Sequence, residues 1–207
     1  MPYIENRIVH DADAHTMELP NWFDQYGNNK IQKAFKDRFQ GNKGLAQTYF
    51  ENIDQVHQGK SYQEKNSEEL MVRKNYDALG SFNKEDRSKA LDLLGVKSQL
   101  VFPTSPNVWL ESLEHGTDID MLYDVAEATN RAQIDFCSQD SRLLPATYVP
   151  LADIEKSIKI AKSAIDLGSS ALLIPWACPK NHSTSHIGFD PLWSMAEEAG
   201  IPILFHV

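Results

Sequence analysis

Three side chains that can bind a metal stand at the ends of two apolar segments of this sequence. Asp13 and His15 end the segment 7–15, and His206 follows the apolar run 201–205. Side chains two residues apart on a β-strand share a face and lie about 6.5 to 7 Å apart, so Asp13 and His15 can reach one cation. A single histidine at a strand end is more often a hydrogen-bonded residue than a ligand. The combination of Asp13, His15 and His206 favours a metal site with mixed oxygen and nitrogen ligands.

Three further residues are candidates for supporting roles. Strict alternation places Asp11 on the face of Asp13, one layer deeper, where we expect hydrogen bonding behind the ligands rather than ligation. Glu18 could orient His15 as a supporting carboxylate or could cap a helix. Trp176 ends another apolar run and is expected to form an apolar wall of a substrate pocket, or else part of the core.

The elements that must position these residues alternate between strands and helices from about residue 83 onward. Capping residues and apolar spacing predict helices that begin at Asn83, at Asp118 or Asp120, at Asp153 and at Asp190. Apolar runs predict strands at 98–103, 143–150, 170–176 and 201–207, in addition to the opening strand. This alternation is typical of a parallel α/β sheet with helical crossovers.

Two parallel architectures remain, an open doubly wound sheet and a (β/α)8 TIM barrel. The first strand is not followed by a G-x-G-x-x-G turn, which favours the barrel. Only five strands are visible, and a full barrel usually needs roughly 250 residues. We therefore expect residues 1–207 to form a partial barrel with the first five strands of eight. A polar segment at about 20–82 is expected to be an irregular insertion with one or two short helices.

Composition limits the classes of partner. The chain has 207 residues and a net charge of −9 without a basic run, which argues against nucleic acid as a partner. No stretch approaches 18 apolar residues and no leader-like segment opens the chain, so we expect a cytoplasmic protein that does not bind membranes. Cys137 and Cys178 show no metal-binding or disulfide spacing. Open sheet edges make a homo-oligomer possible.

Four segments in order resemble one family. "VHDADAHTMELPNW" (9–22) is similar to the opening "DxDxH...E" of the amidohydrolase superfamily, in the branch of aminocarboxymuconate-semialdehyde decarboxylase and the resorcylate decarboxylases. "DRSKALDLLGVKSQLVFPT" (86–104), "RLLPATYVPLADIEKSI" (142–158) and "FDPLWSMAEEAGIPILFHV" (189–207) resemble later segments of that branch. The resemblance covers about residues 7–22 and 83–207.

The resemblance implies a metal-dependent barrel enzyme that hydrolyses or non-oxidatively decarboxylates a small carboxylate- or carbonyl-bearing substrate. It assigns Asp13, His15 and His206 as ligands of one divalent metal ion. Zinc is the first expectation, with manganese or magnesium as alternatives. The family's catalytic base is expected beyond Val207. The alternative to an enzyme is an inactive fragment or a non-catalytic binding module on the same scaffold.

Overall fold

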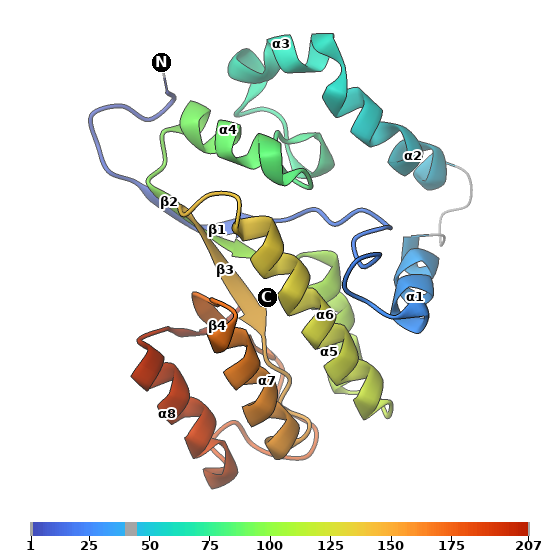
Figure 1. Ribbon diagram of the computed structural model, residues 1–207, viewed down its shortest axis with the longest axis vertical. Helices are drawn as coiled ribbons and strands as arrows, with labels where there is room; N and C mark the ends of the chain where they lie inside the picture. The colour runs from blue at the N-terminus through green and yellow to red at the C-terminus, as the bar shows by residue number, and fades with distance from the viewer. Residues whose placement is uncertain (1, 40–44, 207) are drawn as a thin grey trace.

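The computed structural model describes residues 2–39 and 45–206, and its centre is a parallel sheet (Figure 1). The sheet order follows the chain, with every neighbouring pair parallel. The strands are β1 (His10–His15), β2 (Ser98–Phe102), β3 (Leu143–Tyr148), β4 (Ala171–Ile174) and β5 (Ile203–Phe205). The sheet curls into a half-barrel, as expected for a partial (β/α)8 barrel.

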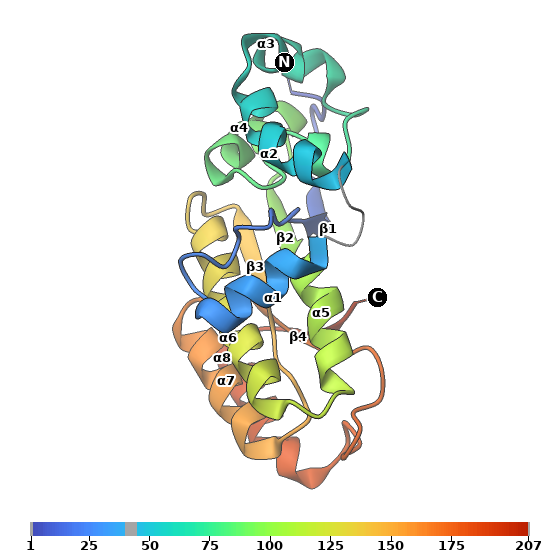
Figure 2. The ribbon, with the colours of Figure 1, turned by 90° about the vertical axis from the view of Figure 1, so that its right-hand side faces the viewer.

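Helices connect the strands and cover the sheet. They are α4 (Lys84–Leu94), α5 (Ser105–Glu114), α6 (Ile119–Cys137), α7 (Ile154–Asp166) and α8 (Asp190–Ala199), the last preceded by the short helix η2 (Ile187–Phe189). Figure 2 shows α6, α7 and α8 along one side of the sheet and the C-terminal end on the other, and α5 packs against α6. The chain therefore returns from each strand end across a helix to begin the next parallel strand.

The predicted capping residues mark the ends of these helices. The Asn83 side chain accepts hydrogen bonds at the start of α4, and Asp153 does so at the start of α7. Of the two candidate starts for α6, Asp118 is the cap, because its carboxylate accepts from the backbone N–H of Met121. Gly95 ends α4 with a φ of 79°, a conformation that suits glycine.

The polar insertion is more helical than the sequence analysis predicts. In place of one or two short helices it contains α1 (Asn29–Phe39), α2 (Leu45–Gln58) and α3 (Lys60–Glu69), followed by the short helix η1 (Asn75–Asp77). Ile31 and Phe35 of α1 join the main core, Ile53 of α2 is buried, and Tyr62 of α3 packs with Leu79 and Ala90. Tyr62 is the one apolar residue of α3, so the sequence of that helix gives a weak helical signal. Helix α5 was likewise not assigned from the sequence.

The main apolar core lies between the sheet and helices α5 to α8. A second cluster contains Ala14, Val101 and Leu143 from three strands, packed against Leu91 of α4 and Phe136 of α6. This second cluster shows which face of β1 and β2 is covered by helices. Within the two described ranges, no helix has the length and apolar character needed to cross a membrane.

Candidate metal centre

Strand β1 contains a bulge that decides which side chains face the inside of the half-barrel. Asp11 pairs with Gln99 of β2, but Ala14 pairs with Val101, so three steps on β1 match two steps on β2. The extra residue reverses the alternation. Ala14 consequently joins Val101 in the helix-covered cluster, and His15 turns to the inner face beside Phe102.

The bulge corrects the prediction that Asp11 shares a face with the metal ligands. Asp11 lies on the same face of the sheet as its pairing partner Gln99, and its Oδ2 accepts from the Gln99 amide at 2.9 Å. Its Oδ1 accepts from the backbone N–H of Asp13 at 3.1 Å. Asp11 therefore forms hydrogen bonds as expected, and one of them holds the backbone of the predicted ligand Asp13. His10 is exposed and hydrogen-bonds to the Ser98 hydroxyl at 2.7 Å.

A buried arginine ties this arrangement to helix α4. The Arg87 side chain donates to Gln99 Oε1 at 3.0 Å and to the backbone carbonyl of His15 at 3.2 Å. Arg87 is almost fully buried, and burial lowers the pKa of its guanidinium. The negative charge of Asp11, two hydrogen bonds away through Gln99, opposes that effect. The main-chain positions of Asp13 and His15 are thus fixed from behind the strand.

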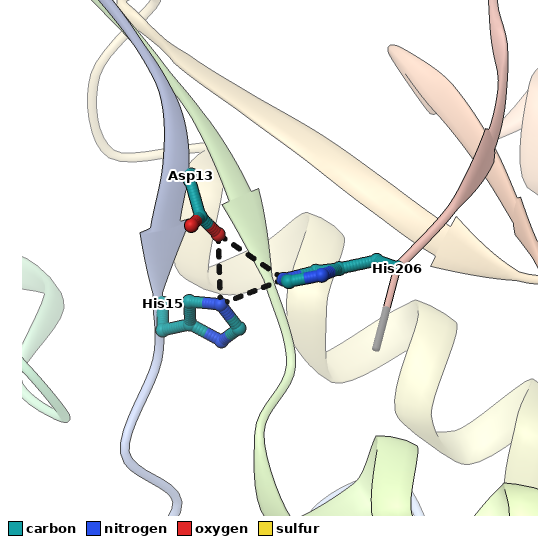
Figure 3. Close-up of side chains that lie close together, drawn as sticks. All are labelled: Asp13, His15 and His206. Carbon is teal, nitrogen blue, oxygen red and sulfur yellow. Dashed lines mark hydrogen bonds and ion pairs between the residues drawn. The ribbon is translucent and has the colours of Figure 1, made fainter. Parts of the chain in front are cut away.

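The three predicted ligands converge on one point, although β1 and β5 are the two outer strands of the sheet (Figure 3). Asp13 Oδ1 lies 3.1 Å from His15 Nε2 and 3.1 Å from His206 Nε2. The two Nε2 atoms are 2.9 Å apart. The ring of Phe102 packs edge-on against His206, with the ring centroids 4.4 Å apart. Curling of the sheet therefore brings its two edges together at the carboxyl ends of the strands.

The protons available to these atoms cannot satisfy all three contacts. His15 Nδ1 lies 3.0 Å from the hydroxyl of Thr104, which itself donates to the backbone carbonyl of Thr16. Thr104 must therefore accept from His15 Nδ1–H, which leaves a lone pair on Nε2 of a neutral ring. Burial is the largest effect on the pKa of His15 and lowers it, which favours that neutral form. Asp13 Oδ1 and His15 Nε2 then both present lone pairs to the centre. Of the three converging atoms, only His206 Nε2 can carry a proton.

A divalent cation fits this donor set. Asp13, His15 and His206 are the residues that would hold such an ion, because their donor atoms lie 2.9 to 3.1 Å from one another. The set combines two imidazole nitrogens, which suit zinc, with one carboxylate oxygen, which suits manganese or magnesium.

Glu18 lies behind the centre and reaches His15 only through Thr104. Its carboxylate accepts from the backbone N–H groups of Thr104 at 3.0 Å and Ser105 at 2.8 Å, where α5 begins. Burial raises the pKa of Glu18 to about 6, while these hydrogen bonds and one from the Thr16 hydroxyl oppose the shift. Glu18 thus performs the helix-capping role, and its link to His15 is indirect.

The remaining predicted residue, Trp176, lies just beyond the carboxyl end of β4. Its side chain is 36% exposed, and its backbone N–H donates to buried Glu111 of α5 at 3.1 Å. A role in substrate binding stays a prediction. His182 and His186 contact each other in the following loop and do not join the metal-binding cluster found among the described residues.

Sequence reasoning missed two residues that support the centre. Thr104 comes two residues after an apolar strand, and a hydroxyl at that position was the available signal. Arg87 occupies a helix position where an arginine is usually exposed, so nothing in the local pattern marks it. Both roles depend on contacts with β1, which lies more than 70 residues earlier in the chain.

Comparisons with known proteins support the fold. No family model matches the sequence, and no curated protein sequence matches it. Among solved structures, an amidohydrolase from Mycobacterium avium subsp. paratuberculosis is similar, with a TM-score of 0.69 and 19% identity over 99% of this chain and 60% of that chain. This likeness confirms, at the level of fold, the resemblance read from the sequence.

A second similar structure is 5-carboxyvanillate decarboxylase from Novosphingobium aromaticivorans, solved in complex with manganese and 4-hydroxy-3-methoxy-5-nitrobenzoic acid. The TM-score is 0.52 at 19% identity, over 97% of this chain and 49% of that chain. The present chain thus spans about half to three fifths of the length of the solved structures that it resembles. At this level of identity the similarity establishes a shared fold and not a shared reaction.

Proposed function

We propose that this chain carries the metal-binding part of a hydrolase or carboxy-lyase that acts on a small carboxylate-bearing substrate. The observation that carries the proposal is the convergence of Asp13, His15 and His206 at the carboxyl ends of β1 and β5. Catalytic groups of (β/α)8 barrels lie at this edge of the sheet. The chemistry that a divalent cation supplies at such a site is Lewis acidity toward water or a substrate oxygen.

We propose manganese as the ion. The site includes a carboxylate oxygen, which suits manganese, and a structural relative was solved with bound manganese. Zinc, expected from the sequence, has no specific support here. Cytoplasmic location and self-association stay predictions from composition and topology.

A hollow next to the centre supports a carboxylate-bearing substrate. It has a volume of about 480 Å³ and is lined by Arg38, Phe39, Thr104, Ser105 and Val108. Thr104 also contacts His15 through Nδ1, so the hollow lies behind this ligand, on the side of the ring away from Nε2.

Arg38 provides an uncompensated cation at that hollow. Its guanidinium lies 5.5 Å from the centre of the Trp109 ring, and none of the described acidic side chains forms an ion pair with it. Desolvation lowers the pKa of the Arg38 guanidinium. A substrate carboxylate placed there could form a bidentate pair with the guanidinium.

The test is calorimetric titration of the purified chain with Mn²⁺ and Zn²⁺, followed by titration of the Mn²⁺-loaded chain with 2-hydroxybenzoate. We expect one Mn²⁺ per chain, and 2-hydroxybenzoate binding that Arg38→Gln abolishes without changing Mn²⁺ affinity. Release of CO2 from aryl carboxylates, or cleavage of N-acyl amines, then distinguishes the two reaction classes. A chain without stoichiometric metal would overturn the proposal and favour a non-catalytic binding module.

A further inference from the structure

Thr104 joins three parts of the fold that meet behind His15. It lies two residues after β2, at the start of α5, and its hydroxyl donates to the backbone carbonyl of Thr16 at 2.7 Å. A threonine hydroxyl has a single proton, and this hydrogen bond uses it. Any further hydrogen bond of the Thr104 oxygen must therefore be accepted from another donor.

The donor that the hydroxyl meets is the His15 ring. His15 Nδ1 lies 3.0 Å from the Thr104 oxygen. Either nitrogen can carry the proton of a neutral imidazole, and the one that does is set by its partner. With the Thr104 proton directed to Thr16, only the Nδ1–H form of His15 makes this contact favourable.

Glu18 holds Thr104 in that position. The fully buried Glu18 carboxylate accepts from the Thr104 backbone N–H at 3.0 Å and from the Thr16 hydroxyl at 2.6 Å. The Thr16 backbone N–H in turn donates to the Phe102 carbonyl at 3.0 Å, which ties the end of β1 to the end of β2. One buried carboxylate therefore contacts both Thr104 and Thr16, the residue whose carbonyl accepts the Thr104 proton.

We infer that Thr104, held by Glu18, is a positioning residue that keeps the His15 proton on Nδ1 and so keeps Nε2 free to bind a cation. This inference rests on the proposed metal centre, yet the proton position can be measured without metal. Partners of this kind behind a ligating histidine typically change metal affinity by about 10- to 100-fold when removed.

The experiment compares wild type, Thr104→Val and Thr104→Ser. Valine keeps the shape of threonine and removes the acceptor, whereas serine keeps the hydroxyl. The ¹⁵N chemical shifts of the metal-free His15 ring report which nitrogen carries the proton, and calorimetry reports Mn²⁺ affinity. We expect Nδ1–H in wild type and Thr104→Ser, and in Thr104→Val a loss of that preference with Mn²⁺ affinity about 10- to 100-fold lower. Thermal unfolding verifies that each variant is folded.

The outcomes separate the two proposals. Wild type that carries the His15 proton on Nε2 overturns the inference, even if Thr104→Val fails to fold. A Thr104→Val variant with unchanged proton position and Mn²⁺ affinity also overturns it. If wild type shows Nδ1–H but binds no metal, the metal centre is refuted whereas the role of Thr104 in setting the proton position stands. Glu18→Gln, which retains one acceptor oxygen, is expected to weaken the Nδ1–H preference less than Thr104→Val does.

Discussion

The Nε2 atoms of His15 and His206 lie 2.9 Å apart although 191 positions separate them in the chain. His15 ends the first strand and His206 directly follows the fifth, and these strands share no hydrogen bonds because they form opposite edges of the sheet. Their contact depends on the curvature of the whole sheet. A site built in this way responds to any change that alters how β1 is held.

Replacing Asp13 tests whether the three converging atoms bind metal. Asp13→Asn removes the anionic ligand, and we expect Mn²⁺ affinity to fall by more than about 100-fold, since supporting residues alone account for 10- to 100-fold. Calorimetric titration measures the effect. Asp120→Asn is the matched control, because Asp120 is an exposed aspartate paired with Lys156 away from the centre. Equal affinities in the two variants would contradict the assignment of Asp13.

Replacing Asp11 tests whether the bulge positions the ligands. Asp11→Ala removes acceptors from the Asp13 backbone and the Gln99 side chain. We expect about 1 to 2 kcal/mol lower free energy of unfolding, from two lost hydrogen bonds, and Mn²⁺ affinity lower by about 10-fold. Denaturant unfolding and calorimetry measure these quantities. Asp11→Asn, which can still accept one bond, is expected to fall between wild type and alanine. An alanine variant with wild-type metal affinity would show that the bulge needs no support from Asp11.

Local patterns predicted the residues at the strand ends but not the contacts behind them. The runs that form β3, β4 and β5 are apolar, and helix caps such as Asp153, between β3 and β4, separate them, so sequence alone located them. His206 could be placed at a strand end for the same reason. The ligand triad therefore follows from topology once five parallel strands are assigned.

The orientation of Asp11 could not be predicted because a bulge is a property of pairing between strands. Within β1 the residues alternate regularly, and only the register against β2 reveals the extra residue. Thr104 was missed for a related reason, since its partner His15 lies 89 positions away. Helix α3 was missed because it has one apolar side chain, Tyr62, which leaves little periodicity to detect.

Glu114 is expected to make stability fall as the pH rises. This carboxyl of α5 is 1% exposed, accepts one hydrogen bond from the Leu151 backbone, and has a second oxygen without a partner among the described residues. Burial, reinforced by the charge of Glu111, raises its pKa from 4.5 to about 7. Between these values the folded chain retains a proton that the unfolded chain has released. The free energy of unfolding therefore decreases through this window.

Glu114→Gln removes that dependence. At pH 4.5 the variant and wild type should be similarly stable, and at pH 8 the variant should be more stable by up to about 3 kcal/mol, which is the equivalent of the pKa difference. Urea unfolding at several pH values measures the difference between the two proteins. Glu198→Gln on the exposed surface of α8 serves as the control and should show no such trend. A Glu114→Gln difference that stays constant with pH would contradict the burial cost assigned to Glu114.

Gly80 links stability of the fold to the metal centre. Its φ is 71°, and a Cβ at this position would lie 2.4 Å from the Cα of Arg87. Its backbone carbonyl accepts from the Arg87 side chain at 3.3 Å, and Arg87 also donates to the His15 carbonyl. Gly80→Ala must therefore displace α4 or the loop before it, in addition to adopting a left-handed conformation. We expect a cost of at least about 3 kcal/mol, from overpacking and backbone strain together.

Gly168 provides the matched control for that substitution. It also has a positive φ, 102°, but no atom lies within 4 Å of the position a Cβ would occupy. Gly168→Ala should therefore cost only the conformational strain, about 1 to 2 kcal/mol, and leave Mn²⁺ affinity unchanged. Where Gly80→Ala remains folded, its Mn²⁺ affinity should fall because Arg87 no longer holds the His15 backbone in place. Equal losses of stability in the two variants would show that the close approach of Gly80 to α4 contributes nothing beyond its backbone conformation.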